Sequence, residues 1–305
     1  MFFQVTMIIQ KIIRKIYKLF HPPVGEVLML HRVVEGRSLL AANRKMEITP
    51  EFLEQTIRAY IQKGWQIISL DEVYEITVNK KKQKKPFVCF TFDDGYVDNY
   101  EIAYPIFKKY NCPFAIYVAT DFPDRKAAMW WYALEAILKD NDVITLGDGT
   151  QLPAATIDEK NAVFDIIRSN VFQAKDMEER VQAMLKNYSF SYSTLADCLA
   201  LSWDQIAKLA AEPLCTIGSH AVTHTPLTNL LIKEVIEELH DSKIRIEDCI
   251  LKPVVHFAYP YGIYNQQIAV SVEHAGYKTA TLANGGKVRL EKRSEFIIKR
   301  ISLEE

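Results

Sequence analysis

Short apolar runs alternate with helix-like segments over most of the chain after residue 22. The runs that predict strands are VLML (27–30), WQIISL (65–70), FVCFTF (87–92), FAIYVA (114–119), LCTIGS (214–219), VVHFAY (254–259), TATLA (279–283) and FIIKRI (296–301). These runs are apolar throughout, which is typical of parallel strands covered on both faces. The pattern predicts an α/β fold, a distorted (β/α)7-8 barrel of TIM-like type.

Helix boundaries and one long insertion can also be read from the pattern. Thr49 begins a helix that ends before Gly64, and Ser202 begins another. Between about residues 128 and 200 the alternation of strands and helices gives way to polar helical segments. We therefore expect one barrel domain over residues 23–305 that carries a helical insertion.

Residues 1–22 form a separate, basic amphipathic segment. Its cationic positions repeat at helical spacing between large apolar residues, and they are Lys11, Arg14, Lys15 and Lys18. The apolar stretch is too short to span a membrane. Two interpretations stay open for residues 1–20: a helix that lies on an anionic membrane surface, and a helix that packs on the barrel.

Composition adds limits on partners and location. The 305 residues carry a formal net charge of -1, so no overall basic field points to nucleic acid as a partner. The five cysteines are scattered and form no CxxC pair, which favours free thiols in a reducing compartment. Because the charges and apolar residues near the start are not in signal-peptide order, we expect a cytoplasmic location, peripheral at the inner membrane if residues 1–20 bind it; an extracytoplasmic location also stays open.

Two carboxylates stand side by side where a buried strand ends. Asp93 and Asp94 follow FVCFTF, at the end of the barrel where active sites lie. Adjacent buried carboxylates repel each other, and a divalent cation bound to one of them would relieve this repulsion. The nearby Asp98 is expected to be a helix N-cap.

A pair of histidines supplies the remaining ligands for such a cation. His220 and His224 follow the strand LCTIGS at i, i+4 spacing, so on one helical turn both imidazoles face the same way. Two neutral histidines and one aspartate leave positions open for water and substrate, as hydrolytic metal sites require.

These residues resemble the polysaccharide deacetylases of the NodB-homology type, carbohydrate esterase family 4. The motifs TFDDG (91–95), SHAVTH (219–224) and FAYPYG (257–262) match in order. The resemblance implies the family's barrel and a metal-dependent hydrolase. It implies that Asp93 is the general base, and that Asp94, His220 and His224 bind Zn²⁺, with Co²⁺ or Ni²⁺ as alternatives. It also implies that the backbone N–H of Tyr261 stabilises the oxyanion.

The chain departs from the family pattern in three places, one of which is the absence of the fourth motif, an Asp-Trp element that supports the arginine of the third motif. The late Leu-x-His motif, whose histidine acts as the acid, is absent, but His31 follows the first strand in the same form. This arrangement resembles the permuted poly-N-acetylglucosamine deacetylase branch, and it makes His31 the candidate acid, with a purely structural histidine as the alternative. Ala258 occupies the position where most members carry an arginine that pairs with the base. Asp93 must therefore be oriented differently.

Four further residues are candidate substrate contacts. Trp130 and Trp131 can form an aromatic wall against a sugar ring or can be core residues of the insertion. Tyr96 and Pro260 lie within or next to the first and third motifs. The partner they imply is a glycan that contains an N-acetylated amino sugar.

The resemblance supports one leading function and leaves two alternatives open. The leading hypothesis is hydrolytic removal of N-acetyl groups from amino sugars of a bacterial polysaccharide or glycan precursor. The alternatives are removal of another acyl group, such as formyl, from a lipid-linked sugar, and a catalytically weak relative that only binds carbohydrate.

Overall fold

The computed structural model describes residues 22–81, 83–174, 176–290 and 295–305. The basic amphipathic segment expected over residues 1–22 lies almost wholly outside the described residues. Within the described residues, no helix combines the length and the apolar character that crossing a membrane requires.

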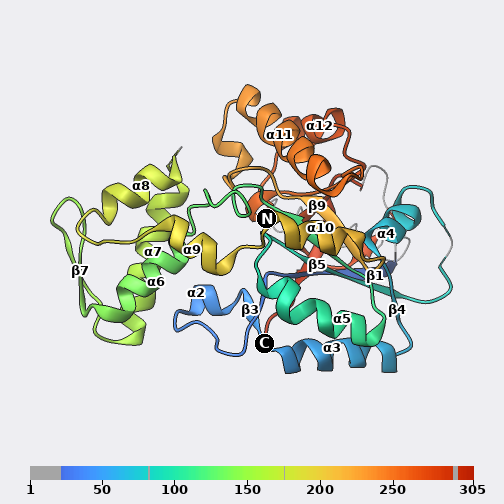
Figure 1. Cartoon of the computed structure of the whole chain (residues 1–305), viewed down its shortest axis with the longest axis horizontal. Coiled ribbons are helices and arrows are strands. Elements are labelled where there is room, and N and C mark those ends of the chain that lie inside the picture. Colours follow the sequence, from blue (N-terminus) through green and yellow to red (C-terminus); the bar gives the residue numbers. More distant parts are fainter. Residues whose placement is uncertain (1–21, 82, 175, 291–294) are drawn as a thin grey trace, which may run out of the picture.

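Seven parallel strands close into a barrel (Figure 1). In spatial order they are β1 (Pro23–Leu30), β13 (Ile298–Ser302), β11 (Thr279–Gly285), β10 (His256–Ala258), β9 (Cys215–Ser219), β6 (Phe114–Val118) and β5 (Phe87–Phe92), which pairs again with β1. Two short strands extend the sheet outside this ring, β12 (Val288–Arg289) beside β1 and β4 (Gln66–Ile67) beside β5. The predicted distorted β/α barrel is confirmed, with seven strands in its ring.

The first and last strands of the chain are neighbours in the ring. β1 runs parallel to β13 on one side, with Leu28 opposite Ile301, and parallel to β5 on the other, with Leu30 opposite Phe92. The N–H of Asp93 donates to the carbonyl of Leu30 at 3.0 Å, which continues the pairing past both strand ends. The residues that follow β1 and β5 therefore emerge side by side at the same end of the barrel.

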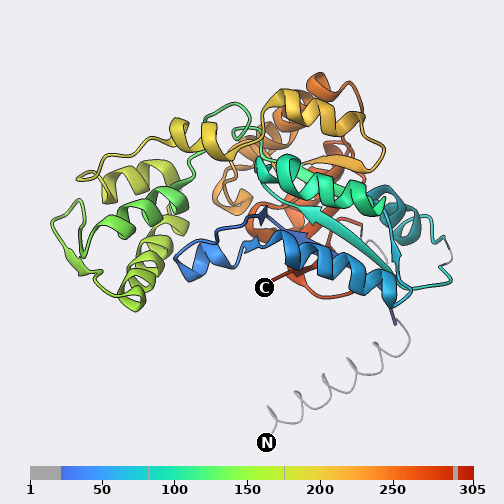
Figure 2. The same cartoon turned by 60° about the horizontal axis from the view of Figure 1, so that its bottom comes forward.

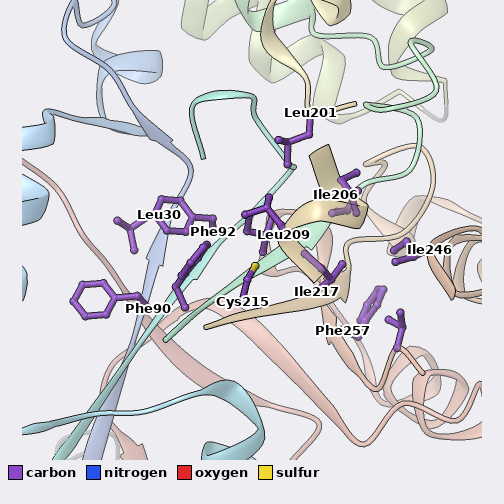
Figure 3. Close-up of a cluster of buried hydrophobic side chains, with 14 of the residues drawn as sticks. Leu30, Phe90, Phe92, Leu201, Ile206, Leu209, Cys215, Ile217, Ile246 and Phe257 are labelled. Carbon is purple, nitrogen blue, oxygen red and sulfur yellow. The ribbon is translucent and has the colours of Figure 1, made fainter. Parts of the chain in front are cut away.

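Alternate residues of each strand face the barrel interior and the outer helices. In β5, Phe87 and Cys89 belong to the inner core, whereas Val88, Phe90 and Phe92 belong to the outer core. Figure 3 shows this outer core, in which Phe90 and Phe92 pack with side chains of later strands and helices. Because side chains alternate along a strand, Thr91 and Asp93 continue the inward-facing series that begins at Phe87.

Helices cover the outside of the barrel (Figure 2). They are α3 (Pro50–Gln62), α4 (Leu70–Thr77), α5 (Tyr104–Tyr110), α10 (Trp203–Ala211), α11 (Ile232–Ile250) and α12 (Gln266–His274), with a π-helical turn η1 (Asn99–Ala103) and 3-10 turns η2 (Leu227–Asn229) and η3 (Pro260–Gly262). As expected, Thr49 caps α3 and Ser202 forms a capping box with Gln205 at α10. The predicted strand over 65–70 is shorter, because Leu70 already begins α4.

A largely helical segment projects from the barrel between β6 and α10 (Figure 1). It contains α6 (Trp130–Asp140), the hairpin β7 (Val143–Thr145) and β8 (Gln151–Pro153), α7 (Ile157–Phe172), α8 (Met177–Met184) and α9 (Tyr192–Leu199). Its apolar side chains form a second core that also includes Tyr96 and Phe122 from the loops after β5 and β6. The short helix α2 (Ala41–Arg44), near the small sheet of β2 (Arg32–Val33) and β3 (Glu47–Ile48), packs against this core through Leu40.

Candidate active site

The candidate site lies at the carboxyl ends of the barrel strands. His31 follows β1, Asp93 and Asp94 follow β5, His220 follows β9 and Tyr261 lies in η3 after β10. Side chains of all five residues line one pocket of about 170 Å³. Carboxyl ends of parallel barrel strands converge on one mouth, which is why residues so distant in sequence meet there.

An ion pair with Arg300 fixes the carboxylate of Asp93. Two guanidinium nitrogens of Arg300 donate to the two carboxylate oxygens of Asp93, each at 2.6 Å. The same guanidinium donates to the hydroxyl of Thr91 at 3.0 Å and to the carbonyl of Leu282 at 2.7 Å. Both partners are buried, so this planar fork sets the orientation of the carboxylate.

The ion pair also controls the charge of Asp93. Burial by itself would raise the pKa of this carboxyl group, but the guanidinium of Arg300 outweighs burial and holds the pKa below its ordinary value. Arg300 thus supplies from β13 what the sequence lacks at Ala258, which is buried in β10. The sequence carries one signal for this contact, an arginine at an inward-facing position of a barrel strand.

Asp94, His220 and His224 form a three-residue group that could hold a metal ion. Their candidate ligand atoms all lie within 4.8 Å of one another. One carboxylate oxygen of Asp94 is 3.1 Å from Nε2 of His224 and 3.5 Å from Nε2 of His220. That oxygen is buried and has no conventional hydrogen-bond partner among the described residues, as expected of an atom that binds a cation.

The chemistry of His220 fits a metal ligand. Its Nδ1 lies 2.8 Å from the carbonyl of Ala258, so Nδ1 carries the proton and Nε2 keeps a free lone pair toward Asp94. Burial lowers the pKa of His220 to about 4 despite the nearby carboxylates, and the imidazole is neutral at physiological pH. A neutral imidazole and an ionised carboxylate are the donor set that Zn²⁺ prefers.

The expectation that the two histidines share a helical turn is wrong. Residues 220–226 form a loop, in which Ala221 and His224 have φ of 65° and 58°. Glu238 of α11 holds this loop, because its carboxylate accepts hydrogen bonds from the N–H groups of Val222 at 2.7 Å and Thr223 at 3.1 Å. These contacts, together with the left-handed residues, bring both imidazoles to Asp94 without a helix.

Asp98 is not an N-cap through its side chain, in contrast to the expectation. Its carboxylate is buried and accepts hydrogen bonds from the N–H of Val33 at 2.9 Å and from Nε of Arg32 at 2.8 Å. The next residue, Asn99, donates to the carbonyl of His31 at 2.8 Å. The segment that begins with Asp93 therefore also fixes the backbone on which His31 stands.

The two tryptophans are buried wall residues of the pocket. Trp130 is stacked on Phe164 at 5.8 Å between ring centroids, and Trp131 meets the ring of His224 edge-on at 5.8 Å. The side-chain amide of Asn43 donates to the carbonyl of Trp131 at 3.1 Å, which ties this wall to α2. Both tryptophans belong to the core of the insertion and also line the pocket, and their contact with a sugar ring stays a prediction.

Tyr96 and Pro260 lie beneath the pocket and do not line it. Tyr96 is fully buried, accepts a hydrogen bond from Nε1 of Trp131 at 3.2 Å and packs edge-on against Phe122. Pro260 is buried at the start of η3. The structure therefore corrects both expected substrate contacts, because neither side chain is accessible to a sugar.

Tyr261 closes the pocket on the side of the histidines. Its backbone is left-handed, with φ of 57°, and its ring lies 4.5 Å from the ring of His224. Phe172, the last residue of α7, contacts the Tyr261 ring at 4.6 Å. Left-handed tyrosine is rare and costly, and together with Asp94 at φ of 75° it marks the site as locally strained.

Comparison with known proteins identifies the family. The model of the polysaccharide deacetylase family matches residues 80–280, a span that includes the first three motifs. The chain therefore belongs to the polysaccharide deacetylase family, a family of hydrolases that act on acylated glycans.

Individual relatives share the fold at low sequence identity. The chain is 22% identical over 260 residues to YxkH of Bacillus subtilis (strain 168), and the match covers 85% of this chain and 64% of that protein. The deacetylase PplD of Streptococcus pyogenes, solved with acetate, superposes with a TM-score of 0.63 at 20% identity, covering 92% of this chain and 93% of that one. IcaB of Ammonifex degensii gives 0.61 at 17% identity and covers 92% of both chains.

Proposed function

We propose that the protein is a metal-dependent hydrolase that removes N-acetyl groups from the amino sugars of a polysaccharide or glycan precursor. One observation carries the proposal: a group of Asp94, His220 and His224 suited to a metal stands beside Asp93, which Arg300 keeps ionised. A pure binding module has no use for an oriented base next to such a group. The family membership agrees with this activity.

Asp94, His220 and His224 would hold a divalent cation, with Zn²⁺ preferred by their donor set. Such a cation, when bound, supplies a Lewis acid for carbonyl polarisation and water activation. The residues of the chain supply the rest. Asp93 is the base that takes a proton from the attacking water, and its fixed orientation keeps a lone pair toward the pocket.

The leaving amine needs a proton donor, and we assign this role to His31. His31 lines the same pocket as Asp93, and its backbone carbonyl is held by Asn99. When the C–N bond breaks, the amine takes the proton from the imidazole and acetate is released. The backbone N–H of Tyr261 is the candidate donor to the developing oxyanion, as its position in η3 at the pocket wall permits.

Acetate release from N-acetylglucosamine oligomers, measured together with bound metal, tests the proposal. We expect metal-loaded wild type to release acetate and a chelator to abolish release. Asp93→Asn and His31→Ala should keep the metal but lose roughly 10²- to 10⁴-fold in kcat, the usual contribution of a general base or acid. Asp165→Asn, a matched change on an exposed face of α7, should have no effect.

Two outcomes would contradict the proposal. Bound metal without acyl release from a broad panel of acylated glycans would favour a carbohydrate-binding relative. Full turnover by His31→Ala with an intact metal site would remove His31 from the mechanism and leave the acid unassigned.

A further inference from the structure

The acid of the proposed mechanism, His31, makes few contacts through its own ring. Its side chain lines the catalytic pocket, and within the described residues no hydrogen bond to its imidazole is found. The place of the ring in the pocket therefore depends on how firmly the backbone of residue 31 is held. That backbone leaves β1 beside the segment that follows β5.

The segment that carries Asp93 holds this backbone at three points. The N–H of Asp93 donates to the carbonyl of the residue before His31 at 3.0 Å, and the side-chain amide of Asn99 donates to the carbonyl of His31 itself at 2.8 Å. The carboxylate of Asp98 accepts a hydrogen bond from the N–H of Val33 at 2.9 Å. Both side chains are buried, Asp98 at 4% exposure and Asn99 at 0%, so water does not compete for these hydrogen bonds.

An arginine next to His31 extends the same network. Arg32 donates from Nε to the second carboxylate oxygen of Asp98 at 2.8 Å. Its guanidinium carbon lies 5.1 Å from the ring centroids of both Tyr96 and Tyr132. A guanidinium between two aromatic faces gains from both of them, the more so where water is largely excluded. The side chain that follows His31 is therefore held by a carboxylate and by two aromatic rings.

Asn99 occupies its position at a cost to stability. Its amide oxygen is buried and has no hydrogen-bond partner among the described residues, although its amide nitrogen binds the carbonyl of His31. A buried acceptor without a partner loses the hydrogen bonds that it would make to water. An apolar side chain would avoid this cost, so packing alone does not account for an asparagine here. The contact that the asparagine adds is the one with His31.

We propose that Asp98 and Asn99 are positioning residues for His31. The proposal rests on the function proposed above, in which His31 protonates the leaving amine. The same short segment carries the base Asp93, so it places the base directly and the acid through hydrogen bonds to the backbone. Because the amine accepts its proton as the C–N bond breaks, a displaced imidazole slows this step and leaves substrate binding unchanged.

Two substrates distinguish the acid step from the rest of the site. N-acetylglucosamine oligomers release an amine that needs a proton, whereas para-nitrophenyl acetate releases a phenolate that leaves without one. Under the proposed mechanism, hydrolysis of both uses Asp93 and the group of Asp94, His220 and His224. The ratio of amide to ester turnover, measured on the metal-loaded full chain, therefore reports on the acid alone.

Three variants alter the network without changing the acid itself. Asn99→Asp keeps the shape of the side chain but replaces the donor with a carboxylate oxygen, and Asn99→Ala removes the group. Asp98→Asn removes the negative charge. Asn141→Ala and Asp124→Asn are matched controls outside the catalytic pocket, because Asn141 also donates to a backbone carbonyl and Asp124 also pairs with an arginine. Urea unfolding identifies any variant that does not fold, and the remaining variants then carry the test.

Both Asn99 variants should lose roughly tenfold to hundredfold in kcat for the amide with KM unchanged, because a small displacement of a catalytic group costs that much. Their ester turnover and metal affinity should stay close to those of wild type. Asp98→Asn should show the same pattern, and the two controls should show no change. In protein with labelled histidines, the NMR signals of the His31 imidazole, assigned by their loss in His31→Gln, should shift in the three variants and stay in place in the controls.

Equal losses on the amide and the ester would show a general structural role and overturn the proposal, as would unchanged amide turnover by both Asn99 variants. If metal-loaded wild type releases no acetate from the amides, the proposed function fails. The NMR signals then decide the positioning by themselves, because shifted signals of His31 uphold it and unmoved signals reject it.

Discussion

The pairing of Asp93 with Arg300 explains how a buried carboxylate stays ionised. Two parallel hydrogen bonds at 2.6 Å fix the carboxylate plane, and the positive charge offsets the cost of burial. The guanidinium comes from the last strand of the barrel rather than from the strand of the third motif. An arginine of β13 therefore supplies the positive charge beside Asp93 that most family members are expected to place in the strand equivalent to β10.

Replacement of Arg300 should shift the pH dependence of activity. Without the guanidinium of Arg300, burial dominates and the pKa of Asp93 rises. The acid limb of kcat/KM should therefore move to higher pH. Arg300→Ala should also lower the free energy of unfolding by about 3–5 kcal/mol, because it leaves a buried charge unpaired. Urea unfolding and pH–rate profiles measure both effects.

Arg300→Lys keeps the charge but loses the two-pronged geometry, so it should fold better than Arg300→Ala and still lose kcat. Arg58→Lys, on the exposed side of α3, is the control and should stay within about 0.5 kcal/mol of wild type. An acid limb that stays in place in both Arg300 variants would show that another group sets the ionisation of Asp93.

The ionised carboxylate of Asp121 should lower the free energy of unfolding at neutral pH. Its pKa is raised to about 6 in the folded protein, so the folded state binds the proton more tightly than the unfolded state does. Stability is then greatest below the unfolded pKa and falls as the pH rises toward 6. Because the group is partly solvated, we expect Asp121→Asn to raise the unfolding free energy by about 1 kcal/mol at pH 7.5.

This gain should vanish near pH 4, where the wild-type carboxyl group is protonated in the folded state. Thermal unfolding of wild type, Asp121→Asn and the exposed control Asp165→Asn over that pH range would measure it. A gain that persists unchanged at pH 4 would show that charge is not its cause.

Among the elements, the insertion both builds its own core and completes the pocket. α7 ends at Phe172, whose ring lies against Tyr261, and the side chain of Asn229 donates to the carbonyls of Phe172 and Ala174 at 3.3 and 3.4 Å. The end of α7 is thus tied to both η3 and η2. Phe164 and Arg168 of the same helix also line the pocket. Substrate access therefore depends on an element that lies outside the barrel.

Phe172→Ala should raise KM by roughly tenfold while kcat changes little, because it removes support from the pocket wall and leaves the reacting groups in place. Phe190→Ala makes the same chemical change in the insertion, away from the pocket. Both variants should lose about 1–2 kcal/mol of stability, since both rings are partly buried. Steady-state kinetics that show equal KM changes would contradict a specific role for α7.

The sequence predicted the positions of the strands along the chain well, but it predicted poorly which strands pair with each other. Wholly apolar runs such as FVCFTF are unambiguous, because both faces of a barrel strand are covered. Pairing across the ring is a long-range property, so the contact of β13 with β1 and the reach of Arg300 to Asp93 left no mark in local periodicity. The histidine loop was missed for a related reason, since Glu238 and the left-handed residues fix it through tertiary contacts.

At the scale of the whole molecule, the basic segment before the barrel suggests a location for the enzyme. We propose that residues 1–20 bind anionic membranes, through the four cations and the apolar residues between them. Flotation with anionic vesicles should retain the full chain but not a chain that starts at Pro22, and neutral vesicles should retain neither. Replacement of Lys11, Arg14, Lys15 and Lys18 by glutamine should abolish flotation. Equal behaviour of the full and shortened chains would reject the anchor.

The closure of the barrel determines when the site is completed as the chain is made and folds. His31 follows the first strand of the barrel, the three residues that could hold a metal ion lie between residues 94 and 224, and Arg300 lies in the last strand, which pairs with the first. During synthesis, Asp94, His220 and His224 leave the ribosome before Arg300 does. The carboxylate of Asp93 gains its fixed orientation only after residue 300 has left the exit tunnel. The orientation of the Asp93 carboxylate therefore coincides with the joining of β1 and β13.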